Sequence, residues 1–169
     1  VLERADQNSR ITVCKLDIDD LAVINDAFGR QVGDHVLQSV ASRLQSVVAG
    51  EKAIIARFGS DEFAILIENS PTTPDIPTLT ANINSELAEP VYIDNSGLAV
   101  SSCVGVAEHH GPGGEAATLL RAAEAALHRA KHSGQRQWGM FDSQRDAIHR
   151  AGAGWPPRCR ARGKAARST

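Results

Sequence analysis

The chain has 169 residues, of which 42% are hydrophobic, and its formal net charge is −2. This predicts one globular domain with its own core, and the near balance of charge argues against nucleic acid or an anionic membrane as a partner. Aromatic residues make up only 4% of the chain, which argues against a base-stacking surface. No apolar run approaches the ~20 residues of a membrane span, and no signal peptide is recognisable, so we expect a cytoplasmic piece of a larger protein.

The first half of the chain begins with a polar stretch over 1–9, which predicts the frayed end of a helix. A strand over 11–19 starts with β-branched residues and ends in acids. Asp20 is expected to cap a helix that runs to about Phe28, and Gly29 is expected to end it. Gly33 and Asp34 are expected to open a longer helix to about Ala49. The residues expected on the buried face of the first helix are Leu21, Ile24 and Phe28.

The second half begins with a hairpin of two apolar strands, 53–56 and 63–67, joined by a tight turn rich in glycine, serine and acids. The remaining expected elements are a helix over 78–87, strands over 91–93 and 98–106 joined by a turn at 94–97, an alanine-rich helix over 116–132 and a short strand over 138–141. This order predicts an α+β fold in which helices pack on a mainly antiparallel sheet, rather than a doubly wound sheet.

The composition changes towards the end of the chain, where Gly, Pro, Arg and Ala replace the periodic apolar residues. We expect a frayed remnant over 1–9, a domain over 10–142 and a disordered basic tail over 143–169. A non-native end and a nucleic-acid-binding tail are the alternatives for this last segment. Three cysteines without metal-binding spacing, Cys14, Cys103 and Cys159, indicate small apolar residues in a reducing compartment.

Two acidic groups stand far apart in the sequence. Asp17 and Asp19 end the first strand, and Asp61 and Glu62 lie in the hairpin turn. If the hairpin pairs beside the first strand, both groups meet at one sheet edge, where their mutual repulsion calls for a cation. Oxygen ligands without His or Cys favour Mg²⁺ or Mn²⁺ over zinc. Asp19 could instead cap the next helix, so Asp17 is the stronger ligand candidate, and Ile18 could offer its carbonyl.

Several motifs in one order resemble the GGDEF domain of the diguanylate cyclase family. They are Leu16-Asp17-Ile18-Asp19, Ile24-Asn25-Asp26-Ala27-Phe28-Gly29, Gly33-Asp34, Arg57-Phe58-Gly59-Ser60-Asp61-Glu62-Phe63, Val104-Gly105-Val106 and Ala130-Lys131-His132-Ser133-Gly134. The similarity spans about residues 10–142. The resemblance implies a palm-like fold related to nucleotide cyclases, and condensation of two GTP into cyclic di-GMP and pyrophosphate by two domains meeting face to face as a homodimer.

The resemblance also implies roles for individual residues. Asp17, Asp61 and Glu62, with the carbonyl of Ile18, would hold Mg²⁺ or Mn²⁺, and Asp61 and Glu62 would be the catalytic acids. Binding of the nucleotide would fall to the residues Asn25 and Asp34 at the guanine, Gly59 and Ser60 in the turn, and Lys131 and Arg136 at the phosphates. Without the resemblance, each of these residues has an alternative interpretation: Asn25 as a surface polar group, Asp34 as a helix cap and Lys131 as a solvated charge.

Two departures from the family pattern concern the nucleotide site. Ser60 replaces the second glycine of the signature, and Gln135 stands where the family usually has an arginine, with Arg136 one place later. They favour the alternative of a weak or inactive GTP-binding module that regulates a fused sensor or phosphodiesterase domain. A third alternative, an RNA-binding ferredoxin-like domain, is disfavoured by the few aromatic residues and the acidic site.

Overall fold

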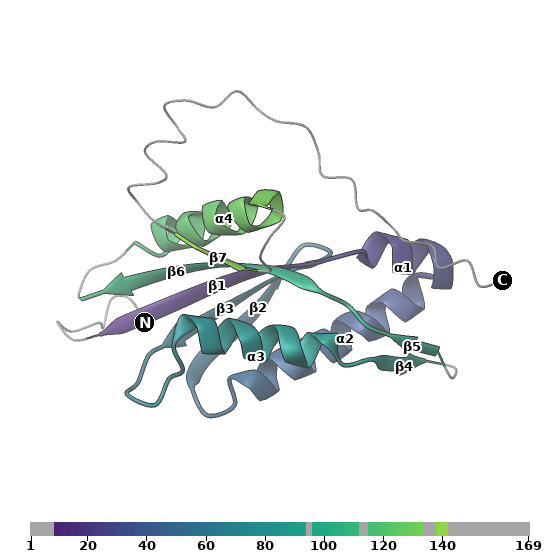
Figure 1. The fold of residues 1–169 in the computed structure, drawn as a ribbon, viewed down its shortest axis with the longest axis horizontal. Coiled ribbons are helices and arrows are strands. Elements are labelled where there is room, and N and C mark those ends of the chain that lie inside the picture. Colours follow the sequence, from purple (N-terminus) through teal and green to yellow (C-terminus); the bar gives the residue numbers. More distant parts are fainter. Residues whose placement is uncertain (1–8, 94–95, 112–114, 134–137, 142–169) are drawn as a thin grey trace, which may run out of the picture.

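The structure is a computed structural model that describes residues 9–93, 96–111, 115–133 and 138–141 (Figure 1). Its helices and strands follow the expected order. The elements are β1 (Arg10–Ile18), α1 (Leu21–Phe28), α2 (Arg30–Val47), β2 (Lys52–Phe58), β3 (Glu62–Glu68), α3 (Ile76–Ala88), β4 (Val91–Ile93), β5 (Ser96–Leu98), β6 (Ser102–His110), α4 (Ala116–Ser133) and β7 (Trp138–Met140).

The main sheet has five strands in the order β2-β3-β1-β6-β7, and β4 and β5 form a separate two-stranded sheet. The pairs β2–β3, β3–β1 and β1–β6 are antiparallel, and β6–β7 is parallel. The predicted α+β class with a mainly antiparallel sheet is therefore confirmed. β1 is central, with β3 and β6 as its neighbours, and its apolar side chains are buried because helices pack on both faces of the sheet.

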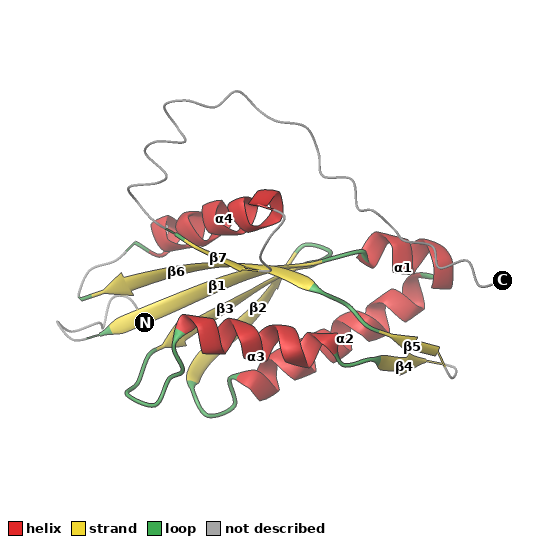
Figure 2. Ribbon diagram, viewed as in Figure 1, coloured by secondary structure: helices red, strands yellow, loops and turns green. Residues whose placement is uncertain are grey.

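Helices cover both faces of the sheet, with α4 on one side and α2 and α3 on the other (Figure 2). The larger core lies on the side of α2 and α3, where Leu16 and Ile18 of β1 pack with residues of these helices. The smaller core lies under α4, where Ile11 and Val13 of β1 meet Leu119, with Ala122 and Ala123 beside it. Alternation along β1 therefore sends Lys15 and Asp17 towards the side of α4.

The glycine at position 105 of β6 allows α4 to lie unusually close to the sheet. A Cβ atom at Gly105 would come within 2.1 Å of the backbone nitrogen of Leu127 and 2.2 Å of the carbonyl oxygen of Ala123. Both are backbone atoms of a regular helix and cannot move aside independently. Gly105 thus sets how closely the charged residues of α4 approach β1.

The starts of the first two helices differ from expectation. Asp20 adopts a left-handed conformation with φ 59°, and its side chain makes no cap hydrogen bond. The second helix begins at Arg30, immediately after Gly29, so that Asp34 lies inside the helix rather than capping it. Gly29 has φ 89° and is the single residue that separates α1 from α2, so no longer loop joins these helices. Phe28, expected on the buried face, is 51% exposed. The helix α1 lies beyond the end of the main sheet and packs mainly on α2 (Figure 1).

The strand expected over 98–106 is divided in two. Ser96–Leu98 pairs with Val91–Ile93, whereas Ser102–His110 joins the main sheet. The separation occurs at residues 99–101, where the carbonyl of Ser101 accepts a hydrogen bond of 2.9 Å from the N–H of Asp19. Periodicity did not reveal this break because apolar residues continue across it.

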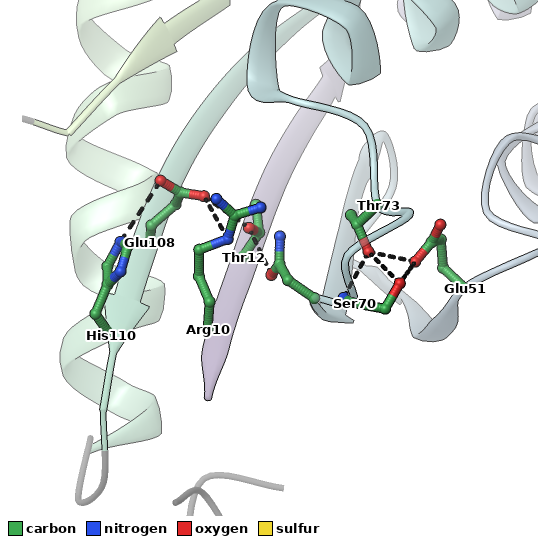
Figure 3. A network of polar contacts seen from close by, with 8 residues as sticks. Arg10, Thr12, Glu51, Ser70, Thr73, Glu108 and His110 are labelled. Atoms are coloured by element: carbon green, nitrogen blue, oxygen red, sulfur yellow. Dashed lines mark hydrogen bonds and ion pairs between the residues drawn. The ribbon is translucent and has the colours of Figure 1, made fainter. Parts of the chain in front are cut away.

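Polar contacts link the elements at the end of the sheet where β1 begins (Figure 3). The hydroxyl of Thr12 lies 2.9 Å from Oδ1 of Asn69 and 3.2 Å from Oε1 of Glu108. Glu108 also pairs with Arg10 at 3.7 Å and with His110 at 3.8 Å. These bonds join β1, β6 and the end of β3, which holds the end of the sheet opposite the acidic residues.

None of the helices in the described part of the chain is long and apolar enough to cross a bilayer. The expected frayed remnant, apart from Ser9, and the expected basic tail lie outside the described residues. The proposed domain bounds of 10–142 therefore stay a prediction. Cys14 is buried, as expected, whereas Cys103 is only partly buried. Burial raises the pKa of the Cys14 thiol to about 12.

Candidate functional site

The two acidic groups predicted from the sequence meet at one edge of the main sheet. Antiparallel pairing of β1 with β3 places Asp17 directly opposite Glu62. The N–H of Ile18 donates a hydrogen bond of 2.9 Å to the carbonyl of Asp61, so the turn between β2 and β3 ends beside the end of β1. Residues far apart in the sequence are thereby neighbours, and we call Asp17, Asp61 and Glu62 the acid cluster.

The turn between β2 and β3 has a defined conformation. Gly59 has φ 72°, a left-handed conformation that favours glycine. Arg57 donates a 2.7 Å hydrogen bond from Nη2 to the carbonyl of Ser60. The Ser60 hydroxyl donates a bond of 2.7 Å to Oδ1 of Asp61. The serine that departs from the expected glycine thus orients one acid of the cluster.

Lys131 of α4 contacts the acid cluster directly. Its Nζ lies 2.6 Å from Oδ2 of Asp17. Burial raises the pKa of Asp17, the charges of Asp61 and Asp19 raise it further, and the bond and positive charge of Lys131 only partly oppose this. Lys131 was expected at nucleotide phosphates, and the structure places it within reach of the same site.

A second lysine holds the other side of the cluster. Lys15 Nζ lies 3.1 Å from Oε2 of Glu62 and also pairs with Glu124 of α4. Burial lowers the pKa of Lys15, but its bonds and charge interactions with Glu124 and Glu62 outweigh that effect, so its pKa is raised overall. Lys15 therefore connects β1, β3 and α4 through ionised groups.

Asp19 faces a different partner. Its Oδ2 accepts a hydrogen bond of 2.7 Å from the hydroxyl of Ser101, and its N–H bonds to the carbonyl of the same residue. These two bonds attach the end of β1 to the segment before β6. This structural role agrees with the choice of Asp17 over Asp19 as the ligand candidate.

The two expected guanine-binding residues lie on neighbouring helices. Asn25 of α1 contacts the start of α2, where a Cβ atom at Gly33 would come within 1.8 Å of its Oδ1. Asp34 follows Gly33 directly and is exposed. The pair α1–α2 thus brings an amide and a carboxylate to one region, with donor and acceptor groups that a purine edge could match.

The cation site has suitable donor atoms but no preassembled ligand set. Within the described ranges, no three His, Cys, Asp or Glu side chains converge where they could hold a metal ion. The donors of the acid cluster are nonetheless all carboxylate oxygens, which suits Mg²⁺ or Mn²⁺. Two of these carboxylates are paired with lysines, Asp17 with Lys131 and Glu62 with Lys15. Arg136 lies outside the described residues.

Sequence reasoning missed Lys15 and Glu124. A signal for Lys15 was present, because it is the one charged residue between Ile11 and Leu16 and shares a face with Asp17 two positions later. Glu124 precedes Lys131 by seven residues, or two helical turns, so both lie on one side of α4. Only the packing of α4 on β1 shows that this side faces the acids.

Comparison with known proteins places these features in a family. A family model described as "Diguanylate cyclase, GGDEF domain" matches residues 1–137. The chain is 33% identical over 138 residues to the bifunctional diguanylate cyclase/cyclic di-GMP phosphodiesterase MucR of Pseudomonas aeruginosa, covering 82% of this chain and 20% of that protein. It is 31% identical over 134 residues to the cyclic di-GMP phosphodiesterase NbdA of the same organism, covering 79% of this chain and 17% of that protein.

A solved structure shows the same fold. The GGDEF domain of DgcB from Caulobacter crescentus, determined in complex with c-di-GMP, superimposes with a TM-score of 0.68 at 28% sequence identity, covering 80% of each chain. The chain spans about a fifth of the length of the curated relatives that it matches.

Proposed function

The chain belongs to the GGDEF family of diguanylate cyclase domains, and we propose from this premise that it binds GTP and condenses two GTP into cyclic di-GMP and pyrophosphate. The observation that carries the proposal is the cross-strand pairing of Asp17 with Glu62, with Asp61 beside the end of β1. This arrangement gathers three carboxylates where two distant segments meet. Catalysis would take place in the intact parent protein, in which two such domains face each other.

The proposed cation site consists of Asp17, Asp61 and Glu62 with the carbonyl of Ile18. Mg²⁺ or Mn²⁺ bound there would neutralise charge on the phosphate being attacked and on the departing pyrophosphate. The carboxylates of this chain would orient the triphosphate. Asp61 would also accept the proton of the attacking 3′-hydroxyl. The oxygen of that hydroxyl would bond to the α-phosphorus while the bond from phosphorus to the departing pyrophosphate breaks.

The remaining residues would hold the nucleotide. Asn25 and Asp34 would bind the guanine edge, which their position on adjacent helices favours. Gly59 and Ser60 would let the backbone of the turn approach the nucleotide. The ammonium group of Lys131 would bind the outer phosphates, and Arg136 is proposed as a further phosphate ligand from the sequence alone.

A GTP-binding regulatory module is the second candidate. It is favoured by the bond from Ser60 to Asp61, which engages an oxygen of the acid proposed to bind the cation. Similarity to NbdA, whose name describes a phosphodiesterase, is compatible with a non-catalytic role in a fused protein. In that role the domain would bind GTP and change the activity of a neighbouring domain.

The two candidates differ in product formation. Incubation with GTP and Mg²⁺ or Mn²⁺, with both nucleotide binding and cyclic di-GMP measured, separates them. Product that disappears in Asp61→Ala but persists in Glu86→Ala, which removes an exposed carboxylate of α3, supports the cyclase. Binding without product at high protein concentration supports the regulatory module. Absence of GTP binding contradicts both.

A further inference from the structure

Two lysines neutralise the acid cluster from different elements. Lys131 of α4 is paired with Asp17 at 2.6 Å, and Lys15 of β1 is paired with Glu62 at 3.1 Å. The Lys15 and Asp17 side chains are each 16% exposed, so these charges are enclosed compared with ordinary surface ion pairs. Salt screens such enclosed pairs only weakly. The lysines therefore belong to the electrostatics of the site.

The ammonium groups contact oxygen atoms that a bound cation would need. Asp17 and Glu62 stand opposite each other, yet each is paired with its own lysine. A divalent ion and an ammonium group cannot both lie within contact distance of the same carboxylate oxygen without strong repulsion. A cation that takes Oδ2 of Asp17 or Oε2 of Glu62 as a ligand therefore requires the lysine on that oxygen to move.

We propose that Lys131 and Lys15 are resident counter-cations of the acid cluster and that an entering divalent cation displaces Lys131 from Asp17. The inference rests on the cation site proposed above. The exchange breaks no covalent bond: a carboxylate oxygen loses its contact with an ammonium group and gains one with the ion. Lys131 keeps its charge and becomes available to phosphate oxygens of the nucleotide, so cation entry and phosphate binding are coupled.

Lys131 is the lysine that is displaced, because its attachment is the weaker of the two. Among the described residues it has one carboxylate partner, Asp17, and its side chain is 36% exposed in the last turn of α4. Lys15 pairs with both Glu62 and Glu124 and is more enclosed. Lys15 therefore stays in place and acts as a positioning residue that connects Glu62 to α4.

The test measures cation binding without nucleotide. Free Mn²⁺ is followed by electron paramagnetic resonance during titration of the full 169-residue chain and of Lys131→Met. Removing one unit charge at about 4 Å is expected to tighten Mn²⁺ binding about fivefold or more. Lys131→Arg, which retains the charge, and Lys52→Met, which removes an exposed lysine paired with Glu68 on β2 and β3, are expected to match the native chain.

The signature is a pair of opposite effects. Lys131→Met should bind Mn²⁺ more tightly but GTP with Mg²⁺ more weakly, whereas a lysine that merely supported the fold would weaken both. Lys131→Gln is titrated in parallel so that one poorly folded variant does not decide the result, and circular dichroism monitors folding. Mn²⁺ binding in these variants that is no tighter than in Lys52→Met overturns the exchange, even if GTP still binds to the native chain.

The failure of the proposed function gives a different result. Tighter Mn²⁺ binding in Lys131→Met together with no GTP binding to the native chain supports the exchange and contradicts the cyclase and regulatory proposals. Mn²⁺ binding to neither the native chain nor the variants overturns the exchange, while the GTP assay decides the function separately.

Discussion

The hydroxyl of Ser60 donates a 2.7 Å hydrogen bond to Oδ1 of Asp61. Asp61 is thereby held by its immediate neighbour in the turn, and Arg57 holds the carbonyl of Ser60 in addition. The bond occupies one acceptor position of a carboxylate that is proposed to bind a cation. This contact makes residue 60 a determinant of how the acid cluster binds its ligands.

Ser60→Gly is expected to raise the affinity for GTP with Mg²⁺ about three- to tenfold. The substitution removes the hydrogen bond to the Asp61 carboxylate. It also removes a Cβ atom from the turn whose backbone is proposed to approach the nucleotide. Ser60→Ala separates the two effects, since it removes only the hydroxyl. Isothermal titration calorimetry of both variants provides the measurement. Unchanged or weaker binding in Ser60→Gly would show that the serine orients Asp61 favourably.

Gly33→Ala is expected to weaken GTP binding without loss of stability. A Cβ atom at position 33 would lie 1.8 Å from Oδ1 of Asn25, so the amide must rotate away. Because this atom is the end of a mobile side chain, the fold can absorb the change, and alanine in a helix is favoured over glycine by about 0.5–1 kcal/mol. Thermal unfolding and GTP titration test the two parts. If Gly33→Ala binds GTP with the affinity of the native chain, Asn25 does not contribute to nucleotide binding.

Gly105→Ala is expected to destabilise the fold by about 1–3 kcal/mol or more, since its Cβ atom would overlap the backbone of α4 at Ala123 and Leu127. Gly50→Ala is the matched control, because a Cβ atom there would meet nothing within 4 Å. Urea denaturation of both variants measures the difference. Equal stabilities would mean that α4 can shift away from the sheet at little cost.

The stability contribution of Asp75 is expected to depend on pH. Asp75 caps α3 by accepting a 2.9 Å bond from the N–H of Thr78. Hydrogen bonding to Thr78, through its side chain first and its backbone N–H second, lowers the pKa of the Asp75 carboxyl. A lowered folded-state pKa means that the contribution is fully present above the unfolded pKa of about 3.9 and is lost as the pH falls through the folded value.

Asp75→Asn retains a good capping residue but cannot ionise. The urea midpoint of the native chain should therefore exceed that of Asp75→Asn at neutral pH, and the gap should close below about pH 4. Glu86→Gln, at an exposed position in α3, controls for the loss of a negative charge. A gap that is constant between pH 7 and pH 3 would contradict the contribution of the ionised cap.

Local patterns were sufficient to predict most of the fold. Apolar and β-branched runs identified β1 and β3, and helical spacing of apolar residues identified α2 and α4, because both patterns are local properties of the chain. The small and acidic residues around Gly59, between two apolar runs, predicted the hairpin, since turn composition is also a local signal. Pairing of β1 with β3 was only the condition under which the acids would meet, and the structure shows that pairing, with Asp17 opposite Glu62.

Long-range packing decided what local patterns could not. Phe28 is exposed although it lies on the apolar face of α1, a helix that packs mainly on α2. The strand expected over 98–106 divides because residues 96–98 pair with β4 whereas residues 102–110 pair with β1. Neither the exposure of Phe28 nor the division of the strand can be recognised from the neighbouring residues in the sequence. The roles of the individual site residues stay proposals.

The sequence by itself placed Asp17 at the end of one strand and Asp61 with Glu62 in a tight hairpin turn, because strand alternation and turn residues are local signals. Their meeting depended on a pairing of β1 with β3 that the tertiary structure supplies. Only the tertiary structure decided which lysine side chains pair with these carboxylates. Lys131 and Glu124 reach β1 because Gly105 lets α4 lie close to the sheet, and Lys15 then pairs with acids from two other elements. Ion pairing depends on distances of a few ångströms between distant segments, and the depth of a helix on a sheet sets those distances.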